Sequence, residues 1–363
     1  MIEPNPDTLK REIIESFGTP CPVIDLNIVE KNIDRAQKLC DEVNIANRPH
    51  IKTHKSPRLA KMQMMAGAIG VTCQKLGEAE VMFESGITDI LIATNILGAA
   101  KSGRLAALQK QVALKVCTDN KVSLENYSVA AKSAGRVIDI LIECDTGQKR
   151  SGVETVEEAL DLAKAIKGDP MLNFIGLLFY PTLTSWAATQ SFCDELIVAL
   201  NEIGLRPEII STGGTPNFIN IGQLKGSTEH RAGTCIFNDR MMIQAGFASI
   251  EDCALKIFTS IVSRAGENRG ILDAGSKSLT SDMGDLEGYG LIMEYPKAQI
   301  KKLAEEHGFL DFENCKQKPE IGKIVRVIPN HVCVCVNMVD QLVAVRNNQI
   351  VEVIEVKARG LLV

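Results

Sequence analysis

The sequence predicts an α/β fold, a (β/α)8 barrel of the TIM type followed by a smaller C-terminal antiparallel β domain. The chain has 363 residues, more than the roughly 250 of a single barrel. Strand-like apolar runs alternate with helix-like stretches about eight times, which is typical of this barrel. Beyond Phe247 strand-like runs follow one another with short turns. We therefore expect a barrel over residues 19–246 and a β-rich domain over residues 247–363 that also includes residues 1–18.

Eight runs rich in Val, Ile and Leu are expected to form the barrel strands. They show little strict alternation of polar and apolar residues, as parallel strands covered on both faces do. Helical spacing predicts crossovers over residues 56–66, 77–85, 122–134, 156–166 and 187–203. The runs are PHIKTH from Pro49, AIGVTC from Ala68, TDILIA from Thr88, QVALKVC from Gln111, RVIDILIEC from Arg136, NFIGLLFY from Asn173, PEIIST from Pro207 and TEHRAGT from Thr228.

The C-terminal part predicts an antiparallel sheet. Its runs are short, and Asn347-Asn348 is a typical hairpin turn. The strand-like runs are ALKIFTSIVS from Ala254, GILDAG from Gly270, KIVRVI from Lys323, VCVCVNM from Val332, QLVAVR from Gln341 and IVEVIEV from Ile350.

Composition excludes several classes of function. The chain is 45% hydrophobic with a net charge of −5, and it has no basic block that would follow a phosphate backbone, so nucleic acid is not an expected partner. Residues 1–18 lack the apolar core of a secretory signal, and no run approaches the roughly 18 apolar residues of a membrane span. We expect a cytoplasmic protein whose eleven cysteines are reduced and mostly buried.

Lys52 is the most informative residue, because it lies in the run PHIKTHK between His50 and His54. Such a lysine can be an ordinary solvated residue of a basic turn. Alternatively, an amine at the mouth of a strand loses part of its charge on desolvation. It can then form a Schiff base with an aldehyde such as pyridoxal phosphate.

The other strand ends carry further pocket candidates, because barrel enzymes place their chemistry in the loops that follow the strands. Gln74 follows the second run and Tyr180 closes the sixth. Arg150, in the loop after the fifth run, either lies on the surface or holds a phenolate or carboxylate with its guanidinium. Tyr180 can likewise be an ordinary aromatic residue with its hydroxyl in water.

The segment Thr212-Gly213-Gly214-Thr215 follows the seventh run, and Gly233-Thr234 follows the eighth. Adjacent glycines and small hydroxyl residues allow backbone N–H groups to approach a phosphate, and barrels often bind phosphate after strands seven and eight. The simpler interpretation is that the glycine pair only forms a turn.

A second kind of site is indicated by His331 and Cys333, two residues apart within the strand-like run near Pro329. Side chains at this spacing point to the same side of an extended strand. An imidazole with a thiolate favours zinc or a similar ion. The simpler interpretation is that Cys333 is a buried core residue.

Eight motifs in this order resemble the D-threonine aldolase and D-serine dehydratase family, pyridoxal-phosphate enzymes of fold type III related to the alanine racemase N-terminal barrel. The resemblance runs from about Thr19 to Gly360. The motifs are PHIKTHK, GVTCQKLGEAE, DTGQKRSGV, STGGTP, EHRAGTCIFND, LDAGSK, EEHG and PNHVC.

The resemblance implies a role for each part of the site. Lys52 would carry pyridoxal phosphate and act in catalysis with His54, and Arg150 would face the cofactor's phenolic oxygen. His331 and Cys333 would bind a divalent metal, with zinc favoured and manganese or magnesium possible. The resemblance also implies a homodimer and a small D-amino acid as substrate. The remaining cofactor-binding candidates are Gln74, Tyr180, Thr212, Gly213, Gly214, Thr215, Gly233 and Thr234.

We expect a lyase reaction on a 3-hydroxy-D-amino acid. Dehydratases of the family have His-x-Cys at the metal position, as here, whereas aldolases have His-x-Asp, so elimination to a 2-oxo acid and ammonia is favoured over retro-aldol cleavage to glycine and an aldehyde. The histidine that follows the tyrosine in the aldolases is absent after Tyr180, and Cys235 stands where a tyrosine is common. An amino-acid racemase and a non-catalytic carrier of pyridoxal phosphate are two further candidate functions.

Overall fold

The structure is a computed structural model that describes residues 6–363, with side chains from residue 8 onward. The chain divides into two compact units built from several segments each. The barrel unit comprises residues 35–52, 59–233 and 361–363, and the sheet unit comprises residues 53–58, 234–360 and the chain up to Asp34. The division at residues 246 and 247 that the sequence suggests stays a prediction.

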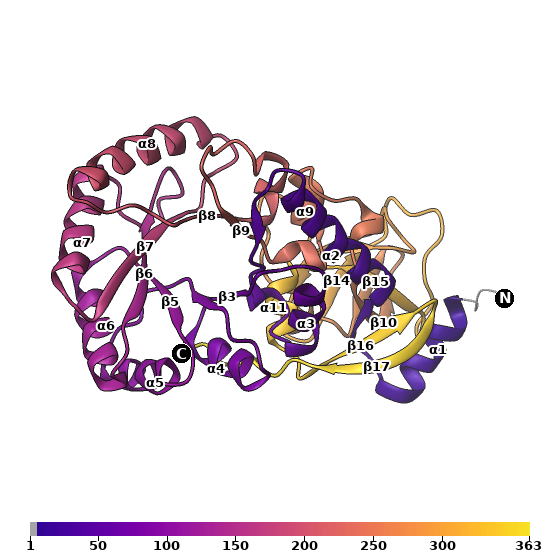
Figure 1. Ribbon diagram of the computed structural model, residues 1–363. Coiled ribbons are helices and arrows are strands. Elements are labelled where there is room, and N and C mark those ends of the chain that lie inside the picture. Colours follow the sequence, from indigo (N-terminus) through magenta and orange to yellow (C-terminus); the bar gives the residue numbers. More distant parts are fainter. Residues whose placement is uncertain (1–5) are drawn as a thin grey trace. The chain divides into compact units, whose positions relative to one another are not determined.

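The barrel unit confirms the predicted fold class. Its eight strands are parallel and follow the order β2-β9-β8-β7-β6-β5-β4-β3. A parallel bridge between His50 and Thr72 links the two ends of this order, and Figure 1 shows the strands as a ring with α5 to α8 outside it. The strands are β2 (Ala46–Asn47), β3 (Val71–Cys73), β4 (Ile90–Ile92), β5 (Leu114–Thr118), β6 (Ile138–Cys144), β7 (Leu172–Phe179), β8 (Ile209–Gly213) and β9 (Glu229–Arg231).

Capping residues mark the ends of the crossover helices. Asn120 accepts a hydrogen bond from the Ser123 amide at the start of α6, and Thr155 forms a capping box with Glu158 at the start of α7. Gly135 ends α6 in the left-handed conformation. The helices are α2 (Leu26–Asp41), α3 (Pro57–Met65), α4 (Leu76–Glu84), α5 (Ala99–Gln109), α6 (Lys121–Ala134), α7 (Val156–Gly168) and α8 (Trp186–Glu202), with short 3₁₀ turns η1 (Ile51–Thr53) and η2 (Thr215–Asn220).

Burial on both faces of the barrel strands explains their continuous apolar runs. In β6, Ile140 and Ile142 belong to the core shared with the helices, whereas Leu141 between them belongs to a second cluster with Leu91 and Cys117. Because neighbouring residues of a strand face opposite sides, a strand covered twice needs apolar residues at successive positions. Strands β8 and β9 depart from this pattern and contribute buried polar side chains instead.

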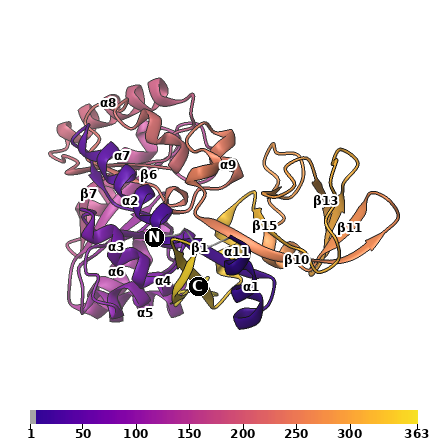
Figure 2. The ribbon, with the colours of Figure 1, turned by 90° about the vertical axis from the view of Figure 1, so that its right-hand side faces the viewer.

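The sheet unit is built on a nine-stranded sheet with the main order β13-β14-β11-β10-β1-β16-β17, in which β15 also pairs with β10 and β12. The sheet is mixed rather than purely antiparallel, because β1 runs parallel to β16. Figure 2 shows the long strand β10 reaching from β1 toward β11 and β13. The strands are β1 (Cys21–Asp25), β10 (Leu255–Ala265), β11 (Arg269–Leu272), β12 (Leu291–Ile292), β13 (Gln299–Leu303), β14 (Gly308–Asp311), β15 (Ile324–Ile328), β16 (Gln341–Arg346) and β17 (Gln349–Glu355).

Helical segments complete the sheet unit. Leu9 and Ile13 of α1 pack in one apolar cluster with Val23 of β1 and Phe258 of β10. Residues 1–5, part of the expected N-terminal contribution to this domain, lie outside the described residues. The helical segments are α1 (Pro6–Phe17), η3 (Thr234–Ile236), α9 (Arg240–Gln244), η4 (Ile250–Asp252), α10 (Ser276–Leu279) and α11 (Val332–Asn337).

Two local predictions need correction. The run VCVCVNM forms helix α11 and not a strand, since the amide of Val332 donates to Asp239 rather than to a neighbouring strand. The run PHIKTH supplies only a bridge at His50 before turning into η1. The predicted turn at Asn347-Asn348 is confirmed, with φ of 51° and 58° between the paired strands β16 and β17.

Two further expectations can be compared with the described chain. All eleven cysteines are free thiols, and nine of them are buried. Within residues 6–363, no helix combines the length and the apolar character needed to cross a membrane.

Candidate active site

Lys52 lies in η1, in the turn that follows β2, and its side chain is half-buried. The preceding backbone is fixed by hydrogen bonds to β9, since the amide of Arg48 donates to the His230 carbonyl and the amide of His50 to the Ala232 carbonyl, both at 2.9 Å. Lys52 therefore stands at the carboxyl end of the barrel strands, where enzymes of this architecture carry out their chemistry.

His50 is a neutral imidazole close to Lys52. Its Nε2 lies 3.1 Å from Oε1 of Gln74, and the Lys52 amide donates to its Nδ1 at 3.5 Å. Burial holds the pKa of His50 well below its ordinary value, and the positive charges of Lys52, Arg231 and Arg150 lower it further. Three cations around one imidazole suit a ligand that brings negative charge.

Gln74 and Arg150 are each held in place by neighbouring groups. The Gln74 side chain donates to the Ala93 carbonyl at 3.0 Å. In the loop after β6, the Asp145 carboxylate accepts the amides of Gly147, Gln148 and Arg150 at 2.7 to 3.0 Å. The loop is thus ordered by Asp145, the first residue of the motif DTGQKRSGV.

Tyr180 connects Arg150 with the glycine loop. The Arg150 guanidinium lies 5.1 Å from the centre of the Tyr180 ring. At Gly214, which has φ of +101°, an added Cβ would lie 2.5 Å from the same ring. Tyr180 therefore packs against backbone that only glycine can supply, which explains the glycine at this position.

The glycine loop between β8 and η2 is held by His230. Thr212 Oγ1 lies 2.8 Å from Nδ1 of His230, whose Nε2 donates to the Gly214 carbonyl at 3.1 Å. The Gly214 amide donates to the Arg231 carbonyl at 2.8 Å, so this amide is already used within the barrel. A phosphate here would need donors other than the Gly214 amide.

Arg231 is a buried charge in β9 that the sequence reasoning missed. Its guanidinium donates to Ser211 Oγ and, at 3.0 Å, to the Phe179 carbonyl. Ser211 in turn donates to Glu229 at 2.6 Å. A strand that contains Glu, His and Arg within three residues is the signal that could have identified this polar cluster.

His54 belongs to the sheet unit, in the short segment of residues 53–58. It is fully buried, and its Nδ1 accepts the Ser56 amide at 3.1 Å. This contact stabilises the turn that follows Lys52.

His331 and Cys333 come together at the start of α11 in the sheet unit. His331 is the N-cap residue, its Nδ1 lies 2.9 Å from Asp239 Oδ2, and Cys333 Sγ lies 3.3 Å from Thr53 Oγ1. Burial lowers the pKa of His331, but hydrogen bonds to Asp239 and Cys333 outweigh it and raise the pKa to about 10.

The pair offers one imidazole nitrogen and one sulfur, a donor set that suits zinc. Among residues 6–363, no group of three or more His, Cys, Asp or Glu side chains is arranged to hold a metal ion. Two protein ligands would leave the remaining positions of an ion to water or substrate, and catalytic metal sites keep at least one such open position.

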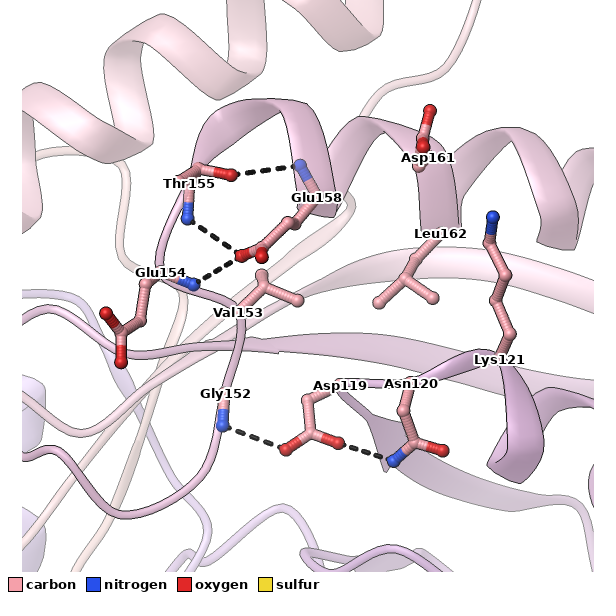
Figure 3. A pocket seen from close by; sticks show the side chains of 10 residues that line it. All are labelled: Asp119, Asn120, Lys121, Gly152, Val153, Glu154, Thr155, Glu158, Asp161 and Leu162. Atoms are coloured by element: carbon pink, nitrogen blue, oxygen red, sulfur yellow. Dashed lines mark hydrogen bonds between the residues drawn. The ribbon is translucent and has the colours of Figure 1, made fainter.

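A cavity of about 630 Å³ lies elsewhere on the barrel unit, between the start of α6 and the start of α7 (Figure 3). Its polar groups are largely paired with one another: Asp119 accepts from Asn120 and from the Gly152 amide, and Glu158 accepts from the amides of Glu154 and Thr155. The residues expected to bind the cofactor do not line this cavity, and its acidic side chains disfavour an anionic ligand.

The parallel barrel with a lysine at a strand end and a cationic cluster beside it defines the class of alanine-racemase-type barrel proteins. Residues 24–241 match the family model "Alanine racemase, N-terminal domain", and residues 254–345 match "Putative serine dehydratase domain".

The chain is 32% identical to D-threonine aldolase of Arthrobacter sp, over 94% of this chain and 93% of that one. The crystal structure of D-threonine aldolase from Filomicrobium marinum has a TM-score of 0.88 at 31% identity, covering 95% and 96% of the two chains. D-threo-3-hydroxyaspartate dehydratase from Delftia sp. HT23 has a TM-score of 0.82 at 28% identity, covering 94% and 97%. Structures of this dehydratase include variants with alanine for a histidine or for a cysteine two positions later, the latter in a metal-free form.

The chain belongs to the D-threonine aldolase and D-serine dehydratase family of fold-type III pyridoxal-phosphate enzymes. The family resemblance, the fold and the expected class of enzyme, a pyridoxal-phosphate-dependent lyase, are confirmed.

Proposed function

We propose that this protein is a pyridoxal-phosphate- and divalent-metal-dependent lyase that dehydrates 3-hydroxy-D-amino acids to a 2-oxo acid and ammonia. The observation that carries the proposal is the pairing of His331 with Cys333, each held by a buried hydrogen-bond partner. The same two residue types at the same spacing are the ones replaced in the variants of the Delftia-type dehydratase.

The barrel unit contributes the proposed cofactor site. The Lys52 amine would bind the cofactor aldehyde, and Gln74, Tyr180 and Arg150 would surround its ring. Thr212 orients the imidazole that supports the glycine loop. The phosphate would be held by the loop of Gly213, Gly214 and Thr215, through donors other than the Gly214 amide, and by Gly233 with Thr234, which is the first residue of the sheet unit after Gly233.

Bound pyridoxal phosphate supplies a conjugated ring that withdraws electrons from the bonds to the substrate's Cα. The Lys52 amine would be the base that removes the α-proton. The lowered pKa of His50 keeps its imidazole uncharged beside Lys52. The imidazole therefore does not form ion pairs with the negative groups of the ligand. His54 would support this turn from the neighbouring segment through its contact with Ser56.

The proposed metal ligands act on the other end of the substrate. A zinc ion on His331 and Cys333, or manganese or magnesium in its place, would supply a Lewis acid for the β-hydroxyl. Loss of the α-proton and the hydroxyl as water leaves an enamine, which takes up water to give the 2-oxo acid and ammonia. Net, one 3-hydroxy-D-amino acid yields one 2-oxo acid and one ammonia.

Dehydration is favoured over retro-aldol cleavage because the latter needs a base at the β-hydroxyl. The turn after Tyr180 offers none of the histidines seen in the aldolases: Ser185 accepts the Thr182 amide at 2.9 Å, and Trp186 then opens α8. The aldolase reaction remains the second candidate, because D-threonine aldolases are among the relatives that match over nearly the whole chain.

The deciding experiment identifies the products by mass spectrometry. The purified protein is incubated with D-threonine, pyridoxal phosphate and Zn²⁺ or Mn²⁺, and L-threonine serves as the matched control. We expect 2-oxobutanoate and ammonia from the D-enantiomer alone. Glycine with acetaldehyde would instead identify an aldolase, and formation of L-allo-threonine, the product of inversion at Cα, without either product would identify a racemase.

A further inference from the structure

Asp239 is a buried carboxylate that connects α9 with the start of α11 inside the sheet unit. Its side chain is fully buried, and it lies 92 residues before His331 in the sequence. In the sequence, neither the position of Asp239 nor its neighbours in the motif EHRAGTCIFND distinguish it from an ordinary helix-capping residue.

Both carboxylate oxygens of Asp239 are already used. Oδ1 accepts the Met242 amide at 3.0 Å and caps α9. Oδ2 accepts the Val332 amide at 3.1 Å and lies 2.9 Å from Nδ1 of His331. Because the Val332 amide and the His331 ring converge on one oxygen, the carboxylate fixes the backbone and the side chain of His331 together.

The contact also determines which imidazole nitrogen is available. A carboxylate oxygen accepts hydrogen bonds, so Nδ1 of His331 carries the proton that points to Asp239. When the ring gives up its other proton to bind an ion, the lone pair of Nε2 is the one available to that ion. Ligating histidines in metalloproteins commonly donate their second nitrogen to a carboxylate in this way.

We propose that Asp239 is the positioning residue of the metal site: it orients His331 and leaves Nε2 as the ligand atom. The inference rests on the proposed metal role of His331 and Cys333. Because both oxygens of Asp239 are used by the Met242 amide and by His331 with the Val332 amide, Asp239 would act through His331 and not as a ligand itself.

Asp239→Asn is the sharpest probe of this role. The amide oxygen can still cap α9, so the fold is preserved, but an NH₂ group now meets Nδ1–H or the Val332 amide. Asp252→Asn is the matched control, because Asp252 is also a buried capping carboxylate of the sheet unit and contacts Ser249 and Lys31.

The experiment measures the affinity of the cofactor-loaded, chelator-stripped protein for Zn²⁺ by competition with a chromophoric chelator. Co²⁺ gives a second readout, the charge-transfer absorption of a cobalt–thiolate bond. We expect Asp239→Asn to bind Zn²⁺ about 10- to 100-fold more weakly and to retain the cobalt–thiolate band at saturating Co²⁺. Asp252→Asn should bind like the wild type.

The inference would be overturned, and the proposed function left intact, if Asp239→Asn binds Zn²⁺ as tightly as the wild type while Cys333→Ser abolishes Zn²⁺ binding. If the wild type binds no Zn²⁺, the proposed metal role itself fails. Should Asp239→Asn not fold, ¹⁵N NMR of the zinc-loaded wild type decides, with His331 identified by comparison with His331→Ala. A protonated Nδ1 with zinc on Nε2 supports the inference, and zinc on Nδ1 overturns it.

Discussion

The His50 imidazole lies among three cationic side chains, and this arrangement sets the chemistry of the residues around it. Its low pKa keeps it uncharged, so the positive charge beside it comes from Lys52, Arg150 and Arg231. A site of this kind attracts a ligand with phosphate, phenolate or carboxylate groups. The cationic neighbours of Lys52 therefore contribute to its proposed role as much as its position at the end of a barrel strand does.

Replacement of Lys52 tests the cofactor assignment directly. Lys52→Ala should lose the visible absorption of lysine-bound pyridoxal phosphate, because no amine remains to bind the aldehyde. Lys61→Ala, on the exposed face of α3, is the control and should keep the band. Borohydride reduction followed by peptide mapping should place the pyridoxyl label on the peptide that contains Lys52. A label on another lysine would contradict the assignment.

At the level of single residues, the sequence identified groups with a distinctive local pattern and missed those that depend on tertiary contacts. Lys52 and the glycine pair stand out because their neighbours are unusual. The roles of Arg231 and Asp239 come from groups that reach them across the fold, such as Ser211 and His331. Periodicity along the chain does not contain this information.

At the level of elements, barrel strands such as β4 and β6 were predictable because burial on both faces leaves a continuous apolar run. The first strand, β2, lies before the run PHIKTH that was expected to form it. The run VCVCVNM was wrongly predicted as a strand since alternating valines also suit a buried helix. The sequence placed His331 and Cys333 on one side of a strand, whereas the structure brings them together as the N-cap and second residue of α11.

His230 joins three elements of the barrel and makes their stability depend on pH. It contacts Thr212 of β8 and the Gly214 carbonyl before η2, and its ring lies 4.7 Å from that of Phe218. Burial lowers its pKa to about 3. The unfolded chain therefore binds a proton below the ordinary value near 6.5, whereas the folded chain does not.

Because of this difference, the contribution of His230 to the free energy of unfolding is complete above about pH 6.5 and is lost as pH falls toward 3. Between pH 7.5 and 5 the free energy of unfolding should fall by about 2 kcal/mol from this group. Urea denaturation across this range measures it. In His230→Gln, whose amide can replace both hydrogen bonds but does not titrate, the decrease should be smaller by that amount. Parallel slopes for the two proteins would refute the role of His230.

At the level of the whole molecule, the proposed cofactor residues and the proposed metal ligands belong mostly to different units. Lys52 and Arg150 lie in the barrel unit, whereas His331 and Cys333 lie in the sheet unit. The homodimer and the preference for a D-amino acid stay predictions from the family resemblance.

This separation predicts that the two components can be removed independently. Chelation should suppress turnover at least tenfold while the absorption of bound pyridoxal phosphate persists, and added Zn²⁺ or Mn²⁺ should restore the rate. Turnover and absorbance are measured on the same sample. A rate that is insensitive to thorough chelation would contradict the metal role and favour a racemase, which needs no ion.

The place of β1 in the sheet unit has a consequence for biosynthesis. Val23 pairs with Lys256 of β10 on one side and with Val343 of β16 on the other. On the ribosome, β1 therefore emerges well before β16, the strand that covers its second edge. The barrel strands between them complete their pairing with β9 much earlier. During that interval β1 has at least one open edge, and chaperones would be expected to bind such an apolar edge strand.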